Sequence, residues 1–381
     1  MIKKPMKFFI IAGEPSGEFH GGNLINSIKN IIPYSSFIGH GGNTMEKAGM
    51  HVYEHTDNLA IMGFMEVIKH LPRMFKILNK TVKIIEKEKP NRIILIDYPG
   101  FNLRLAKKLV NLNIPITYFI LPQAWAWKEN RVETMKQVLD QALSIFPFEK
   151  NWYESRGLTV NYIGHPLIDT LHITESSGSF YNKHNLNTQE PLLLLMPGSR
   201  QQEIDRHWPI FLNTIEILSK QIPKLQIIIG KSPYVTIANI PSNCKVEFDC
   251  RKAMIFATAA IVASGTATLE CAVENTPMVV CYKLSSLSWG IAKLYTKIRY
   301  SSIVNLIANN RIVPELLQTN MTAENIALEI TPLLNKQSRI RNNMVSDLNK
   351  IKDKIGPPGV YNRAALAIIK KHPKTYKNSV I

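Results

Sequence analysis

Two acidic residues stand where apolar stretches of the chain end, and their positions suit proton transfer or hydroxyl binding. Asp97 closes the run "NRIILID" (91–97). A carboxyl group at the end of a buried strand is costly unless it is paired or used, so Asp97 is a candidate for proton transfer. The alternative is that Asp97 caps the following helix, although Asn102 is better placed for that. Glu14, in the turn "AGEPSGE" (12–18), can bind hydroxyl groups or orient Asp97.

The turn around Glu14 has the form of a phosphate site but the wrong charge. A strand that feeds a glycine-containing turn and then a helix often binds phosphate. Here the turn carries both Glu14 and Glu18, which would repel a phosphate. We therefore expect phosphate to bind elsewhere.

The turn "PGSR" (197–200) is the first candidate for a phosphate site. Pro197 and Gly198 make the turn, and Ser199 could cap the next helix and leave its first N–H groups free for an anion. Arg200 adds a charged fork suited to a diphosphate. The alternative is an ordinary capped turn with a surface arginine.

A second turn of this kind, "SGTATLE" (264–270), places Ser264, Gly265 and Thr266 at a helix start. Glu270 falls one turn into that helix, where it could accept two hydrogen bonds from a ribose. Alternatively, Glu270 only stabilises the helix dipole. Two such turns in one half of the chain favour a nucleotide diphosphate.

The elements that must position these residues alternate between apolar strands and helical segments, which is typical of parallel sheets covered on both faces. The predicted strands are 7–12, 35–39, 91–97, 115–121, 142–148 and 159–164, then 191–196, 225–230, 245–250, 259–264 and 278–283. The polar stretch between Asp169 and Glu190 interrupts this alternation and marks a domain boundary. We expect an α/β chain of two Rossmann-like βαβ domains that face a cleft.

Four parts follow from this pattern. Residues 1–168 form an N-terminal domain, 169–190 a linker, and 191–345 a C-terminal domain that carries both candidate phosphate turns. Residues 346–381 form a C-terminal helix and a frayed tail, which could pack back on the N-terminal domain.

Composition limits the class of protein. The chain has 381 residues, 45% of them hydrophobic, and a formal net charge of +17. That balance favours a polyanionic partner, such as nucleic acid, an anionic membrane or a phosphorylated substrate, although an AT-rich genome also enriches lysine. No apolar stretch is long enough to span a bilayer. The four cysteines form no C-x-x-C pair, and no D-x-D or His/Cys cluster suggests a metal site.

Taken together, the motifs resemble those of the lipid-A-disaccharide synthase family, whose members are glycosyltransferases of the GT-B fold. The resemblance covers almost the whole chain and rests on "AGEPSGE" (12–18), "MGFMEV" (62–67), "IDYPGFN" (96–102), "PQAWAWKENR" (122–131), "FPFEK" (146–150), "IGHPL" (163–167), "PGSR" (197–200), "SGTATLE" (264–270), "VNLI" (304–307) and "VPELLQ" (313–318). The family commonly has a second acid after the first aspartate of "IDYPGFN", where this chain has Gly100. Glu18 stands where the family usually has aspartate.

The resemblance implies that the N-terminal domain (1–168) faces the acceptor and the membrane and that the C-terminal domain (191–345) binds the UDP-sugar. It also implies a reaction. UDP-2,3-diacylglucosamine would donate its sugar to the 6-hydroxyl of 2,3-diacylglucosamine 1-phosphate (lipid X), giving a β-1,6 disaccharide 1-phosphate and UDP with inversion. Asp97 would be the general base, and Asn305 resembles an asparagine that the family retains near the donor. The alternative for Asn305 is a loop residue that satisfies its own backbone. We expect no metal cofactor; a homodimer is allowed but not indicated by the sequence.

Substrates with acyl chains require access to a membrane, and residues 61–89 are the candidate segment. Ile61, Met65, Ile68, Leu71, Phe75, Leu78, Val82 and Ile85 have helical spacing and predict a core stripe. Three apolar residues lie off that stripe, surrounded by Lys69, Arg73, Lys76, Lys80 and Lys83: Phe64, Val67 and Met74. We expect this patch to bind anionic lipid on the cytoplasmic face of the inner membrane. A core helix with a solvated basic face is the alternative.

Three other classes compete with this interpretation. Another GT-B enzyme, such as a sugar-nucleotide 2-epimerase or a peptidoglycan N-acetylglucosaminyl transferase, would share the nucleotide half but not "AGEPSGE" or "IDYPGFN". A nucleic-acid-binding protein would explain the charge, but no helix-turn-helix, zinc or RNP-like pattern is present. A membrane scaffold with an inactive transferase fold is disfavoured by Asp97, Arg200 and Glu270.

Overall fold

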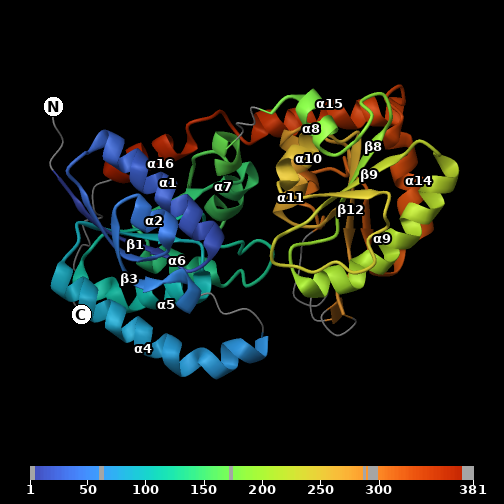
Figure 1. Cartoon of the computed structure of the whole chain (residues 1–381). Coiled ribbons are helices and arrows are strands. Elements are labelled where there is room, and N and C mark those ends of the chain that lie inside the picture. The colour runs from blue at the N-terminus through green and yellow to red at the C-terminus, as the bar shows by residue number, and fades with distance from the viewer. Residues whose placement is uncertain (1–4, 60–63, 171–174, 286–288, 291–298, 371–381) are drawn as a thin grey trace. The chain divides into compact units, whose positions relative to one another are not determined.

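The chain folds into two compact units, each built around one parallel sheet (Figure 1). The computed structural model describes residues 5–59, 64–170, 175–285, 289–290 and 299–370, and within 64–71 it describes the backbone alone. Unit 1 comprises the chain up to Asp169 and from Gly356 onward, and unit 2 runs from Thr170 to Ile355. The two parallel sheets confirm the predicted α/β class.

The sheet of unit 1 has the strand order β3-β2-β1-β4-β5-β6-β7. Its strands are β1 (Lys7–Ala12), β2 (Ser36–Gly41), β3 (Met50–His55), β4 (Arg92–Ile96), β5 (Ile116–Phe119), β6 (Gln141–Ser144) and β7 (Asn161–Tyr162). All neighbouring pairs are parallel, so the carboxyl ends of β1 and β4 lie side by side, with Ala12 opposite Ile96. The sequence pattern missed β3, an edge strand whose side chains after Met50 are only partly covered.

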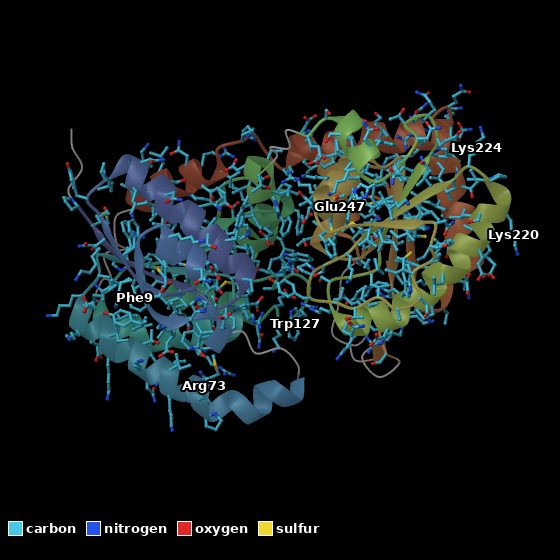
Figure 2. The ribbon with its side chains drawn as sticks, viewed as in Figure 1. Phe9, Arg73, Trp127, Lys220, Lys224 and Glu247 are labelled. Atoms are coloured by element: carbon cyan, nitrogen blue, oxygen red, sulfur yellow. The ribbon has the colours of Figure 1, made fainter. Side chains whose placement is uncertain are left out.

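Helices cover both faces of this sheet. They are α1 (Pro15–Ile31), α2 (Asn43–Lys47), α3 (Thr56–Leu59), α4 (Phe64–Glu88), α5 (Pro99–Leu109), α6 (Arg131–Val138), α7 (Pro147–Glu154) and α16 (Val360–Lys370), with short 3-10 turns at Val110–Leu112 and Pro166–Thr170. Helix α1 packs against α2 and α16, while α4, α5 and α6 pack against one another (Figure 1). Phe9, labelled in Figure 2, is fully buried in a core that α4 and α5 also line.

Unit 2 repeats the same plan with the strand order β10-β9-β8-β11-β12-β13. Its strands are β8 (Leu192–Met196), β9 (Gln226–Gly230), β10 (Cys244–Glu247), β11 (Ala259–Ala263), β12 (Met278–Tyr282) and β13 (Glu315–Leu317). Its helices are α8 (Ser177–Lys183), α9 (Gln201–Gln221), α10 (Cys250–Phe256), α11 (Thr266–Val273), α13 (Ile303–Ala308), α14 (Ala323–Leu334) and α15 (Arg339–Lys354), with a 3-10 turn at Gln318–Asn320. Because β8 and β11 are neighbours, the turns after them share one edge of the sheet.

Two chain segments differ from their predicted form. Helix α8 lies inside the segment predicted as a linker (169–190), where Phe180 is fully buried and the Tyr181 hydroxyl donates to the Phe256 carbonyl at 3.0 Å. Its composition is polar because only one side of a short helix is covered. Helix α15 extends past residue 345 to Lys354, and α16 then packs on α1 in unit 1, where His20 and the Tyr361 hydroxyl are 2.8 Å apart.

The core face of α4 matches the predicted stripe at Leu78 and Ile85, which are buried, and differs from it at two neighbouring positions. Phe75, placed in the core by its spacing, is 49% exposed, whereas Met74, placed in the lipid-binding patch, packs against the core. The reason is Thr81: it is fully buried despite its hydroxyl, because that hydroxyl donates to the Ile77 carbonyl at 2.7 Å and meets His40 Nε2 at 2.7 Å. The side chains of Phe64 and Val67 lie outside the described residues.

Among the described residues, no helix combines the length and the hydrophobicity that crossing a membrane requires.

Candidate active site

Asp97 lies directly after β4, at the carboxyl edge of the unit 1 sheet. Asp97 and Tyr98 have φ angles of 43° and 49°, a left-handed conformation that is uncommon for residues other than glycine. Two hydrogen bonds stabilise this turn: the Tyr118 hydroxyl and the Asn102 amide donate to the Asp97 carbonyl at 2.6 and 2.7 Å. Helix α5 begins after Tyr98 without a side-chain cap. The Asp97 carboxyl is therefore not used as a helix cap.

Burial, with a smaller contribution from the negative charge of Glu14, raises the pKa of the Asp97 carboxyl to about 6. The Tyr98 backbone N–H and the Arg131 guanidinium act in the opposite direction. A carboxyl group with a pKa near 6 can accept a proton at neutral pH and still bind it strongly enough to act as a general base.

Glu14 is exposed at the cap position of α1. It follows β1, and β1 is the neighbour of β4, the strand that leads to Asp97. Between them, the Tyr98 ring lies flat against Gly13, so closely that any side chain at position 13 would overlap it. The Tyr98 hydroxyl donates to the Leu59 carbonyl at 2.8 Å, which fixes the ring. The fold therefore brings the two predicted carboxyl groups to one edge and needs glycine at 13 to do so.

Glu18 has a structural role. One carboxylate oxygen accepts from the Thr44 backbone N–H at 2.8 Å and the other from the Thr56 hydroxyl at 3.0 Å. It therefore caps α2 from α1 and ties in the start of α3.

The two tryptophans of "QAWAWKENR" have different environments. Trp125 is partly buried: its ring packs against Phe148, and its N–H donates at 3.0 Å to Glu149, a buried carboxyl whose pKa is raised by burial to about 7. Trp127 is 47% exposed, and the Lys128 and Arg131 cations lie against its ring. Trp127 is therefore the more exposed of the two tryptophans.

In unit 2, the "PGSR" turn leads into α9, but Ser199 does not cap it. The cap position is Arg200, and the Glu203 carboxylate accepts from the backbone N–H groups of Ser199 and Arg200 at 3.0 and 3.2 Å. The predicted capping role of Ser199 is wrong because α9 begins at Gln201, which makes Arg200 the cap residue. The spacing of Glu203 from Arg200, typical of a capping box, was the signal. Arg200 itself is exposed.

His207 of α9 joins two loops at this edge. It is fully buried, its Nδ1 lies 2.7 Å from the Pro197 carbonyl, and its Nε2 accepts from the Lys283 backbone N–H at 3.0 Å. Burial lowers its pKa, so the ring is neutral with the proton on Nδ1. Since β8 and β12 flank β11, His207 ties the loops on either side of the second turn.

The "SGTATLE" turn is open. Gly265 has a φ of 155°, with empty space where a side chain would be, and it starts α11. Gly265 and Thr266 are exposed, whereas the Ser264 hydroxyl donates to the Ser301 carbonyl at 3.1 Å. The first N–H groups of α11 therefore face an uncovered surface that an anion can approach.

Glu270 lies in α11 beyond the capping position. Burial raises the pKa of its carboxyl, and Arg251 acts against that increase. Nη2 of Arg251 is buried without a hydrogen-bond partner among the described residues. A sheltered carboxylate beside this guanidinium can accept hydrogen bonds from vicinal hydroxyl groups, as the ribose hypothesis requires.

Asn305 does not fit its predicted contact with the donor. It is fully buried, its amide nitrogen donates to the Val313 carbonyl (3.0 Å) and Glu315 (2.7 Å), and its oxygen accepts from the backbone N–H groups of Ile312 and Val313. All four hydrogen-bonding positions of the amide are thus used inside the protein. The alternative, a loop residue that satisfies its own backbone, is also wrong, because Asn305 lies in α13 and its amide bonds to the segment 312–315. Through Glu315 it holds the turn at Ser301 and Ser302.

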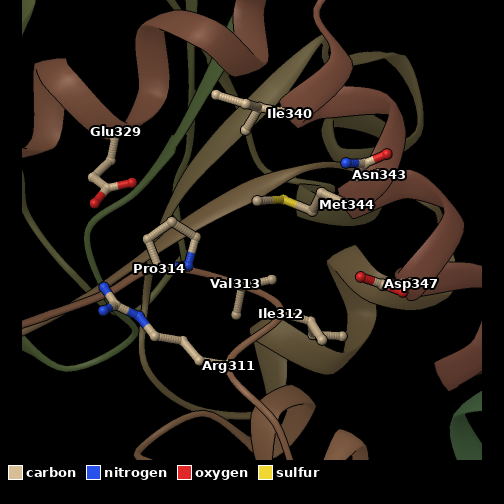
Figure 3. Close-up of a pocket in the computed structure, with 9 residues that line it drawn as sticks. All are labelled: Arg311, Ile312, Val313, Pro314, Glu329, Ile340, Asn343, Met344 and Asp347. Atoms are coloured by element: carbon tan, nitrogen blue, oxygen red, sulfur yellow. The ribbon is translucent and has the colours of Figure 1, made fainter.

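One further cavity in unit 2, of about 340 Å³, lies between the loop before β13 and helices α14 and α15 (Figure 3). Its lining residues are Arg311, Ile312, Val313, Pro314, Glu329, Ile340, Asn343, Met344 and Asp347. No predicted site residue is among them. This cavity is therefore distinct from the edge that carries Arg200 and Glu270.

Known proteins are similar to this chain over nearly its whole length. The family model described as lipid-A-disaccharide synthetase matches residues 8–369. The lipid-A-disaccharide synthase of Solibacter usitatus is 36% identical over 370 residues, covering 95% of this chain and 96% of that protein. The enzyme of the same name from Myxococcus xanthus is 33% identical and covers 98% of this chain and 99% of its own.

Solved structures with much lower identity share the fold. The glycosyltransferase of kitacinnamycin aligns with a TM-score of 0.68 at 13% identity, covering 97% of this chain and all of that one. A UDP-GlcNAc 2-epimerase from Neisseria meningitidis, solved with UDP-GlcNAc bound, aligns with a TM-score of 0.59 at 13% identity over 96% of this chain and 99% of its own. The fold is thus the predicted GT-B fold.

The motifs at both sheet edges, their order along the chain and these matches agree: this chain is a glycosyltransferase that belongs to the lipid-A-disaccharide synthase family.

Proposed function

We propose that the chain transfers 2,3-diacylglucosamine from UDP to the 6-hydroxyl of 2,3-diacylglucosamine 1-phosphate, with inversion and with Asp97 as general base. Membership of the family supports formation of the lipid A disaccharide. The observation that carries the catalytic assignment is the Asp97 carboxyl, which is sheltered at a sheet edge beside Glu14 and has a pKa of about 6.

The proposed reaction is a single displacement. Asp97 takes the proton of the acceptor 6-hydroxyl as that oxygen bonds to the anomeric carbon of the donor, and the bond from that carbon to the UDP oxygen breaks. The leaving diphosphate gains negative charge, which Arg200 and the N–H groups at the start of α11 stabilise. Glu14 binds acceptor hydroxyl groups and keeps the pKa of Asp97 high. We propose that no metal takes part, since these groups supply the positive charge.

Mixing the protein with UDP-2,3-diacylglucosamine and lipid X tests the reaction itself. We expect equimolar UDP and disaccharide 1-phosphate, with a β linkage by NMR and with the same rate after full chelation of divalent metal. Release of UDP without disaccharide, or an α linkage, would contradict the proposed reaction. Loss of activity on chelation, restored by a metal, would contradict the metal-free mechanism alone.

Replacing Glu270 with glutamine tests the ribose contact. Because a neutral amide is a weaker acceptor for two hydroxyl groups, UDP affinity should fall about tenfold while turnover at saturating donor stays within a factor of a few. Calorimetric titration with UDP measures the effect, and Glu274→Gln, one turn further along the chain and paired with Arg251, is the matched control. An unchanged UDP affinity would remove Glu270 from the nucleotide site.

We further propose that α4 binds an anionic membrane. Support comes from the exposed Phe75 ring and from the cationic side chains of α4, among them Arg73, which Figure 2 labels. Replacing Phe64, Val67 and Phe75 with serine should lower recovery on phosphatidylglycerol vesicles severalfold without changing UDP affinity. Leu328→Ser, at an exposed apolar position of unit 2, is the control. Equal recovery of all variants would contradict this role of α4.

A further inference from the structure

Two cationic side chains of unit 1 lie beside the exposed Trp127 ring, and a third is close enough to act on one of them electrostatically. The Lys128 ammonium lies 4.3 Å from the ring centroid and the Arg131 guanidinium 5.3 Å from it. Arg104 of α5 is the third, with its guanidinium 5.9 Å from the Phe75 ring of α4. Lys128, Arg131 and Arg104 are called the cation cluster below.

The members of the cation cluster repel one another. Burial lowers the pKa of the Lys128 ammonium, and the charges of Arg131 and Arg104 lower it further. Burial also lowers the pKa of the Arg131 guanidinium. Both changes mean that the folded protein holds these positive charges at a cost, which a bound anion would offset.

Among the described residues, no carboxylate forms an ion pair of 4.0 Å or less with any member of the cation cluster. The nearby glutamates are paired with other cations: Glu133 with Lys136 at 2.8 Å and Glu129 with Arg156 at 2.7 Å. Aromatic faces hold cations in place without cancelling their charge, so Trp127 and Phe75 position the cluster and leave it free to bind an anion.

The cation cluster is also close to the proposed base. Arg131 is near enough to Asp97 to lower the pKa of its carboxyl, yet the two groups form no ion pair in the described structure. The segment that carries Lys128 and Arg131 is anchored at Trp125, whose N–H donates to Glu149. The proposed base and the cation cluster therefore belong to the same unit and act on one another electrostatically without pairing.

We propose that Lys128, Arg131 and Arg104 bind the phosphate monoester of the acceptor, and so select a phosphorylated glycolipid over its dephosphorylated form. This inference rests on the proposed function, in which the acceptor carries its phosphate and its reacting hydroxyl at opposite ends of one sugar. Arg131 would bind the phosphate from the side of Asp97, and Lys128 and Arg104 from the outer side. The cluster is then a specificity determinant and takes no part in proton transfer.

A binding experiment tests the site independently of turnover. Glucosamine 1-phosphate and glucosamine are titrated into the full chain at low salt, with the parent protein, Arg131→Ala and Lys128→Ala. The parent should bind the phosphorylated sugar at least tenfold more tightly, and each variant should lose most of that difference. Arg131→Lys should keep part of it, and Lys108→Ala, an exposed cation of α5, should keep all of it. Equal binding of the two sugars by the parent protein would overturn the proposal.

A kinetic experiment in neutral detergent then locates the effect. With lipid X, Arg131→Ala should raise the acceptor KM about tenfold or more, while the donor KM and the rate with dephosphorylated acceptor stay within about twofold. Equal losses with both acceptors, or a raised donor KM, would overturn the assignment. So would weaker binding to phosphatidylglycerol vesicles with an unchanged acceptor preference, since the cluster would then bind lipid headgroups. A phosphate-dependent difference in binding without any disaccharide would instead refute the proposed function and leave the site intact.

Discussion

Replacing Asp97 with asparagine should lower kcat by about 10²- to 10⁴-fold, because the amide cannot accept the proton of the acceptor hydroxyl. UDP affinity should stay nearly unchanged, since the nucleotide is assigned to unit 2. Asparagine keeps the size of the side chain and favours the left-handed backbone at this position, where φ is 43°. Loss of activity would therefore not be a folding effect. Asp57→Asn, an exposed acid on α3, is the control. Full activity of Asp97→Asn would refute the base assignment.

The same assignment predicts a pH profile. Since the Asp97 pKa is about 6, the base is ionised above that pH and protonated below it. We expect kcat/KM to fall about tenfold per pH unit below 6 and to level off above it. Glu14→Gln should move the midpoint to lower pH, because it removes the negative charge that helps to raise the Asp97 pKa. An unchanged midpoint in Glu14→Gln would contradict the proposed effect of the Glu14 charge on the pKa of Asp97.

Replacing Arg200 with alanine should lower kcat/KM for the donor by about 10²- to 10³-fold, as expected when one donor to a developing negative charge is lost. The effect should exceed the change in UDP affinity, because the leaving diphosphate gains charge only as the sugar bond breaks. Arg200→Lys should recover part of the activity, since it keeps the charge but not the planar fork.

Arg206→Ala is the matched control for Arg200. Arg206 projects from the same helix, where it donates to the Gln202 carbonyl at 3.1 Å. Initial rates over a range of donor concentrations distinguish the two variants. Equal effects of Arg200→Ala and Arg206→Ala would mean that only the general positive charge of the α9 start matters.

Local signals in the sequence were sufficient where a single stretch of chain decides the structure. Apolar stretches predicted eleven of the thirteen strands in the described residues, most clearly the central ones, because a strand buried on both faces needs apolar residues throughout. The two missed strands, β3 and β13, are both at sheet edges, where partly exposed residues weaken this signal, although the edge strands β7 and β10 were predicted. The glycine-containing turns were also predictable from local sequence, because a few adjacent residues determine where a strand ends and the next helix begins.

Side-chain partners far apart in the sequence were not predictable. Asn305 looks like a loop residue, and only the fold shows that Ile312, Val313 and Glu315 use all of its hydrogen bonds. The burial of Met74 and the exposure of Phe75 on α4 have the same origin, because the buried position of Thr81 on this helix depends on its contact with His40 of β2. Propensity and spacing describe neighbours along the chain, whereas these contacts form between elements.

The sequence by itself determined the α/β architecture, the family and the two sheet edges that carry the proposed site residues, because each depends on motifs of a few consecutive residues. Only the tertiary structure decided which polar groups at those edges are left for a ligand. Glu203 covers two N–H groups, Asn305 is used internally and Glu18 caps α2, whereas Asp97, Glu270 and the cation cluster form no ion pair within the described residues. That distinction depends on burial and on pairing across the fold, which no stretch of sequence contains.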